Sequence, residues 1–138
     1  MTLEHPIRAV VVDASAMVEV LIGDEMWTAR LADWQDTGSQ ILAPPHFRSE
    51  VANALLVGLG FAPSDVISRL QQLFQAGIDI VDRGLVGLFD AIELAHRHRL
   101  SVYDAAYLSL VLDVDGELAT EDRALAMATR KEGMAVIS

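Results

Sequence analysis

The sequence predicts an α/β fold: a three-layer α/β/α arrangement around a short, mostly parallel five-stranded sheet. Short apolar segments alternate with segments whose apolar residues have helical spacing, along all 138 residues. The first segment, residues 7–12, is apolar almost throughout, which is typical of a strand buried on both faces. Parallel neighbours need crossover connections, and the intervening helices supply them. We therefore expect helices on both faces of the sheet.

Five short segments are expected to form strands. Each is largely apolar, and turn residues or helical patterns separate it from the next segment. Asp13 ends the first strand, and Pro44-Pro45 stops the second. In chain order the expected strands are residues 7–12, 40–43, 78–81, 117–120 and 134–137.

Four helices are expected in the first half of the chain. Residues 15–21 follow the first strand, and residues 26–37 repeat apolar side chains at helical spacing. Pro45 is expected to open the third helix, since the N–H that proline lacks is not used in a first turn. Pro63 starts the fourth, which ends at Gly77.

Three further helices are expected in the second half. The first follows Gly84, and the second contains Tyr103, Tyr107 and Leu110 on one stretch. The third spans residues 123–131 and is closed by Gly133. Since no repeat or linker interrupts the pattern, we expect one domain over residues 1–138.

Composition excludes several classes of protein and site. The chain has no cysteine, which excludes disulfides, Cys-ligated zinc and a thiol nucleophile. No apolar run approaches the roughly 20 residues of a membrane helix. No basic segment precedes an apolar one at the start of the sequence, so we expect no secretory signal, no membrane association and a cytoplasmic location.

Four carboxylates occupy informative positions. Asp13 directly follows the first strand, and Asp122 follows the fourth. Asp104 lies at the start of a helix, and Glu50 flanks the apolar face of another. Because functional clefts of parallel sheets lie beyond the carboxyl ends of the strands, these acids can meet at one edge.

Clustered carboxylates without basic partners repel one another, so they raise each other's pKa or bind a cation. Hard oxygen ligands suit Mg²⁺ or Mn²⁺. A water acidified by such an ion can attack a phosphodiester. The alternative is structural: Asp is a favoured N-cap, and Asp13, Asp104 and Asp122 each precede a helix.

The sequence segments around these acids resemble the four motifs of PIN domains. Together, their order and spacing are more specific than any one motif, and the resemblance extends over essentially the whole chain. The matching segments are VVDASA at residues 11–16, PHFRSEVANAL at 45–55, VYDAAYL at 102–108 and LATEDRAL at 118–125. As a small single-domain chain, it is most similar to the VapC-type toxins of prokaryotic toxin–antitoxin pairs.

The resemblance implies an Mg²⁺-dependent ribonuclease in which Mn²⁺ can substitute. It also implies a homodimer and an antitoxin whose tail blocks the active cleft. By motif, the catalytic acids would be Asp13, Glu50, Asp104 and Asp122. Asp13, Asp104 and Asp122 would be the metal ligands. Ser15 and Thr120 would orient carboxylates or waters, and Arg48 and Arg123 are candidates for contact with RNA phosphate.

Two other functions are weighed. A phosphotransfer receiver would need a lysine after a late strand, whereas the only lysine, Lys131, lies at a helix end. A PIN-like scaffold that binds a partner protein or RNA without catalysis remains open.

The formal charge of −10 disfavours long-range attraction of RNA. Two Mg²⁺ ions would still leave the chain acidic, so RNA binding would depend on the metal site and a few local arginines. The same acidity suits an antitoxin with a basic tail.

Overall fold

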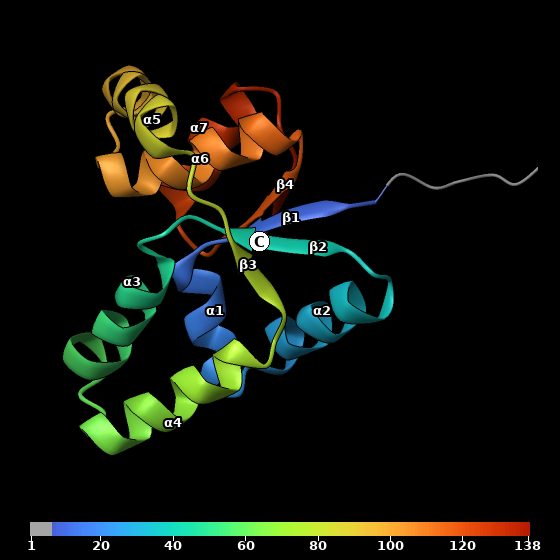
Figure 1. The fold of residues 1–138 in the computed structure, drawn as a ribbon, viewed down its shortest axis with the longest axis vertical. Coiled ribbons are helices and arrows are strands. Elements are labelled where there is room, and N and C mark those ends of the chain that lie inside the picture. The colour runs from blue at the N-terminus through green and yellow to red at the C-terminus, as the bar shows by residue number, and fades with distance from the viewer. Residues whose placement is uncertain (1–6) are drawn as a thin grey trace, which may run out of the picture.

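Five parallel strands form one sheet in the order β3-β2-β1-β4-β5 (Figure 1). The computed structural model describes residues 7–138, so part of the segment concerned by the secretory-signal prediction, residues 1–6, lies outside it. The strands are β1 (Ala9–Val12), β2 (Gln40–Ala43), β3 (Ile78–Ile80), β4 (Glu117–Ala119) and β5 (Val136–Ile137). All four neighbouring pairs are parallel, which confirms the predicted sheet.

Helices cover both faces of this sheet and complete the three predicted layers. Figure 1 shows α5, α6 and α7 on one side and α1 to α4 on the other. The helices are α1 (Ala14–Leu21), α2 (Glu25–Asp36), α3 (Phe47–Asn53), α4 (Pro63–Phe74), α5 (Gly84–His98), α6 (Val102–Val114) and α7 (Arg123–Lys131). A wider helical turn, η1 (Ala54–Gly58), continues α3. Within residues 7–138, every helix is too short or too polar to cross a membrane.

The third helix begins later than its proline suggested. Pro45 lies in a turn that the Phe47 N–H closes by donating to the Pro44 carbonyl over 3.1 Å. The helix therefore starts at Phe47, and the prediction that Pro45 opens it was wrong by two residues. This turn places His46 beside the helix start instead of inside the helix.

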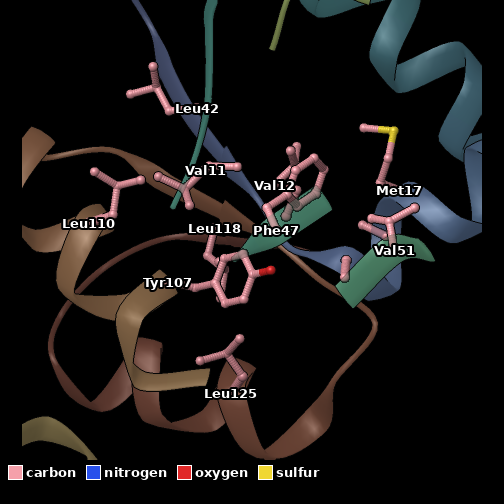
Figure 2. Close-up of a cluster of buried hydrophobic side chains, with 14 of the residues drawn as sticks. Val11, Val12, Met17, Leu42, Phe47, Val51, Tyr107, Leu110, Leu118 and Leu125 are labelled. Carbon is pink, nitrogen blue, oxygen red and sulfur yellow. The ribbon is translucent and has the colours of Figure 1, made fainter. Parts of the chain in front are cut away.

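The core is built on β1, whose residues Val10, Val11 and Val12 are fully buried. Apolar side chains of both helical layers pack around this strand, with Phe47 and Tyr107 among the largest (Figure 2). Burial on both faces explains why β1 is apolar at successive positions instead of alternating. The Trp27 and Trp34 rings are also buried, so both pack in the core.

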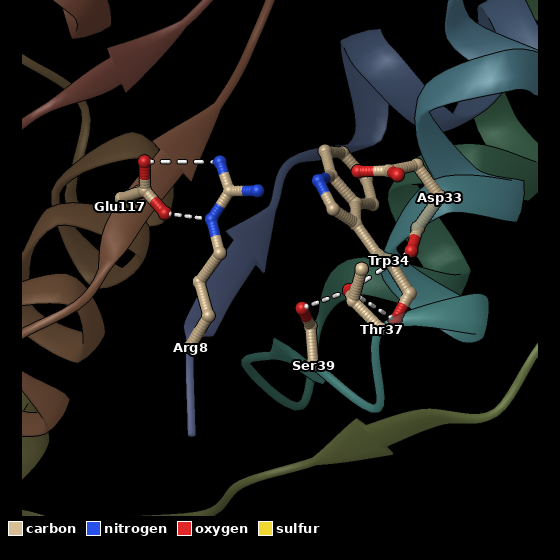
Figure 3. Close-up of polar contacts among 6 residues, drawn as sticks. All are labelled: Arg8, Asp33, Trp34, Thr37, Ser39 and Glu117. Carbon is tan, nitrogen blue, oxygen red and sulfur yellow. Dashed lines mark hydrogen bonds and ion pairs between the residues drawn. The ribbon is translucent and has the colours of Figure 1, made fainter. Parts of the chain in front are cut away.

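Polar contacts fix the amino end of the sheet. Arg8 binds the Glu117 carboxylate through two guanidinium nitrogens and so links the starts of β1 and β4 (Figure 3). Beside α2, the Thr37 hydroxyl donates to the Asp33 carbonyl over 2.9 Å. These contacts leave the opposite, carboxyl edge free for other groups.

Candidate functional site

The predicted acids gather at the point where the chain switches from adding strands on one side of β1 to adding them on the other. From β1 the chain proceeds outward to β2 and β3, then crosses to β4 on the other side of β1. In parallel sheets such a switch point leaves a crevice beyond the carboxyl ends of the strands. Asp13 directly follows β1, and Asp122 follows its neighbour β4 by three residues. The two carboxylates therefore follow the two neighbouring strands that flank this switch point.

Asp13 is the most enclosed of the four acids, with 4% of its surface exposed. Its Oδ1 accepts hydrogen bonds from the Ser15 hydroxyl at 2.7 Å and from the Ala16 N–H at 2.9 Å. Its Oδ2 accepts from the Thr120 hydroxyl. Two donors from α1 and one from the residue after β4 thus fix the orientation of this carboxylate.

The Ser15 and Thr120 hydroxyls each make a second contact. Ser15 Oγ accepts from the Glu121 N–H, and Thr120 Oγ1 accepts from the Asp122 N–H, both at 2.9 Å. Each hydroxyl therefore donates to Asp13 while it accepts from the loop that follows β4. The pair holds Asp13 and Asp122 in a fixed relation, a geometry consistent with the orienting role predicted for both hydroxyls.

The electrostatics indicate carboxylates that raise the pKa values of one another. Burial raises the pKa of Asp13 to about 6, the charge of Asp122 adds to the rise, and the hydrogen bonds from Thr120 and Ser15 oppose it. Burial also raises the pKa of Asp104, and the charges of Asp122 and Glu50 raise it further. Within residues 7–138, neither Asp13, Asp104 nor Asp122 forms an ion pair.

Glu50 reaches the same group from α3, where one ring donates a hydrogen bond to it and a second ring lies beside it. The Tyr107 hydroxyl donates to Glu50 Oε1 over 2.9 Å, and His46 Nε2 lies 2.8 Å from the same oxygen. The Tyr107 ring is buried in the core (Figure 2). Burial and the neighbouring Glu50 charge raise the pKa of Tyr107, so its hydroxyl remains a donor. The sequence places Tyr107 only on a helical stretch, although a buried tyrosine hydroxyl usually needs a partner.

Helix capping accounts for two of the acids and not for a third. Asp13 caps α1, and Asp122 caps α7 by accepting from the Leu125 N–H over 3.0 Å. Ser101, not Asp104, caps α6, and its hydroxyl accepts from the Asp104 N–H. The reading of Asp104 as a cap was therefore wrong, because this residue lies inside the first helical turn.

The chemistry of the donors fits a hard divalent cation. Neighbouring carboxylates raise each other's pKa, and a nearby positive charge stabilises their ionised forms. As they stand, no three His, Asp or Glu side chains among residues 7–138 are grouped closely enough to hold one ion. Mg²⁺ commonly takes one or two carboxylates and completes its shell with water, so a full protein cage is not required.

The two predicted phosphate contacts differ in their surroundings. The Arg48 guanidinium stacks over the Phe74 ring, 4.7 Å from its centroid. Arg123 is exposed and lines a hollow of about 270 Å³ together with Asp122 and Arg130, a cation that the sequence did not single out. Contact with RNA remains a prediction for both Arg48 and Arg123.

Comparison with known proteins points to one family. The PIN domain model matches residues 10–131. No curated protein sequence matches the chain. Among solved structures, the Mycobacterium tuberculosis VapC20, described as a Sarcin-Ricin loop cleaving toxin, has a TM-score of 0.67 and 17% identity. That alignment covers 86% of this chain and 94% of VapC20.

Two toxin–antitoxin assemblies have the same fold. A complex from Klebsiella pneumoniae gives a TM-score of 0.70 at 16% identity, covering 94% of this chain and 96% of the other. VapBC2 from Rickettsia felis, bound to a DNA fragment from the promoter, gives a TM-score of 0.71 at 13% identity. That alignment covers 94% of this chain and 97% of the other. At such identities the likeness concerns the fold, whereas the family model matches most of the sequence: the chain belongs to the PIN domain family.

Proposed function

We propose that this chain is an Mg²⁺-dependent endoribonuclease and the toxin of a toxin–antitoxin pair. One observation carries the proposal: Asp13, Asp104 and Asp122 gather at the switch point of the sheet, and among residues 7–138 none of the three forms an ion pair. Family membership supports nuclease chemistry. The neighbouring VapC20 is described as cleaving an RNA loop, and two further neighbours are toxin–antitoxin complexes.

In this proposal Asp13, Asp104 and Asp122 hold the divalent ion, and Mn²⁺ can replace Mg²⁺. The bound ion supplies positive charge at the scissile phosphate and makes water more acidic. Ser15 and Thr120 hold Asp13 in a fixed orientation, so little reorganisation is needed when RNA arrives. Glu50, fixed through Oε1 by Tyr107, orients the attacking water with its other oxygen.

The proposal includes two protein partners. Helix α5 exposes Leu85, Phe89 and Ile92 on adjacent turns, and an apolar face of this kind suits a second copy of the chain. We propose a homodimer through this face, and Phe89→Glu should convert it to a monomer in sedimentation. The acidic crevice suits an antitoxin whose basic tail enters it, which would displace the metal and exclude RNA.

RNA cleavage by purified variants tests the enzymatic proposal. Each of the four acids is changed to Ala in turn and assayed on RNA with Mg²⁺ and with chelator. We expect cleavage by the unmodified chain with Mg²⁺ alone, and loss of at least about a hundredfold in the Asp13→Ala and Asp104→Ala variants, as for loss of a group that stabilises transition-state charge. Undiminished cleavage by either variant would refute the proposal.

A non-catalytic PIN-like scaffold that binds a partner protein or RNA is the second candidate. It is favoured by the spacing of the acids, since no three of the described ligand-type side chains already surround one point. Calorimetric titration with Mg²⁺ and Mn²⁺ separates the two functions. Saturable binding that Asp104→Asn abolishes supports the enzyme, and absence of binding supports the scaffold.

A further inference from the structure

A cavity of about 260 Å³ opens beside the acidic group, between the turn before α3, the turn before α5, and helices α5 and α6. Its walls are mostly apolar. They include Leu88 and Ala91 from α5, Val102 and Ala106 from α6, and Pro44 from the turn. The volume lies below the roughly 300–1,000 Å³ of pockets for drug-sized ligands, and so suits one flat ring system.

The charges in this cavity do not suit a phosphate. Arg83 lines it, but its guanidinium lies 3.0 Å from Asp90 and 3.4 Å from Asp113 and also donates to the Ser109 hydroxyl. Asp82 adds a carboxylate to the lining, and its Oδ1 accepts from the Gly84 N–H. With Arg83 neutralised and Asp82 negative, the cavity favours a neutral ligand that carries hydrogen-bond donors.

An exposed aromatic ring stands at the wall of the cavity. Tyr103 is 66% exposed, and its ring meets His46 edge to face with centroids 5.5 Å apart. Proteins that bind single-stranded RNA stack unpaired bases on such rings. The exposure leaves the ring accessible to a base.

Two residues connect the cavity to the acidic group. His46 lines the cavity and also lies 2.8 Å from Glu50 Oε1. Tyr103 directly precedes Asp104 in the chain. A ring held in the cavity therefore lies next to the acids, and a phosphate attached to that nucleotide falls within their reach.

Resting on the proposed ribonuclease function, we propose that this cavity binds one unpaired nucleobase of the RNA and so positions the neighbouring phosphodiester at the acidic group. Tyr103 supplies the stacking surface, and the apolar walls exclude water from the base. Asp82 accepts from an exocyclic amino group, which favours adenine, guanine or cytosine over uracil. The cavity-lining Leu88 lies one helical turn from both Leu85 and Ile92, so the cavity borders the apolar face proposed for the homodimer.

Nucleoside binding is tested without metal, so that the result does not depend on cleavage. Adenosine, cytidine, uridine and ribose are titrated into the full chain in EDTA, and backbone amides are followed by NMR. We expect adenosine and cytidine to shift the Gly87, Tyr103 and Ala106 amides, uridine to shift them less, and ribose to leave them unchanged. Tyr103→Ala and the cavity-filling Ala106→Leu should abolish the shifts, whereas Tyr103→Phe and Leu112→Ala, an exposed apolar position on the same helix, should retain them.

Steady-state cleavage gives the second readout. Tyr103→Ala should raise KM about 5- to 150-fold with little change in kcat, the range expected for loss of one stacked base. Absence of nucleoside shifts at millimolar concentration overturns the proposal, as does a Tyr103→Ala variant that loses dimerisation but keeps nucleoside binding. If nucleosides shift these amides but no RNA is cleaved with Mg²⁺, the ribonuclease proposal fails and the base pocket stands.

Discussion

Asp13→Asn should stabilise the metal-free protein at neutral pH while it abolishes RNA cleavage. Asp13 is 4% exposed, and its burial raises the pKa from 3.8 to about 6. The folded protein therefore binds this proton more tightly than the unfolded chain does. The stability of the unmodified protein is lowered as pH rises from about 4 to about 6, and the full penalty is present above that window.

The pKa values set the magnitude. A rise from 3.8 to about 6 corresponds to about 3 kcal/mol of destabilisation at neutral pH. Asn can still accept from Ser15 and the Ala16 N–H, but its amide group faces the Thr120 hydroxyl, which now donates to Asp13. That hydroxyl must rotate to accept, and the lost hydrogen bond reduces the gain by about 1 kcal/mol or more. We expect a net gain of about 1 to 2 kcal/mol.

Urea unfolding in EDTA, followed by the fluorescence of buried Trp27 and Trp34, measures this difference. The variant should be more stable than the unmodified protein near neutral pH, and the gap should close or reverse near pH 4. Asp24→Asn is the matched control, because Asp24 caps α2 and accepts from the Trp27 N–H at 2.9 Å. Its effect should stay within about 0.5 kcal/mol, since Asp and Asn cap helices about equally well. A gap for Asp13→Asn that is equal at both pH values would refute the reasoning.

Three further substitutions test the site and the fold. Tyr107→Phe removes the hydroxyl that donates to Glu50, so kcat should fall with little change in KM. The free energy of unfolding should fall by about 1 kcal/mol. Unchanged kcat in steady-state assays would argue against a positioning role for Tyr107. Gly116→Ala places a Cβ 2.7 Å from the Ala9 carbonyl oxygen, which is backbone, and should cost about 1 to 3 kcal/mol in urea unfolding. Leu118→Ala empties a fully buried position of β4 and should cost about 2 to 5 kcal/mol, and a much smaller loss would place this strand outside the core.

The layout of the fold was predictable because its strands are short and buried. The apolar run at residues 7–12 is typical of a strand covered on both sides, and the helical patterns between strands implied parallel crossovers. The strand order was not predictable, since it depends on contacts between distant segments. The meeting of Asp13 with Thr120, which lie 107 residues apart in the chain, needed that order as well.

The sequence suggested which acids matter but not what holds them. Contact of Tyr107 with Glu50 depends on how α6 packs against α3, and nothing local to either residue indicates it. The turn at Pro44 places His46 between Glu50 and the cavity, a position that depends on the fold and not on its neighbours in the sequence. The stacking of Arg48 on Phe74 likewise depends on the packing of α3 against α4.

Paramagnetic broadening by Mn²⁺ tests most directly the central claim that the carboxyl-edge acids bind a divalent ion. Mn²⁺ is added in substoichiometric amounts to the metal-free chain, and the backbone amide signals are recorded by NMR. We expect selective loss of the Asp13, Asp104 and Asp122 signals, reversal by excess Mg²⁺, and no effect at Asp115, which ends α6 at the opposite end of that helix. Broadening centred elsewhere, or unchanged signals at all three acids, would contradict the account.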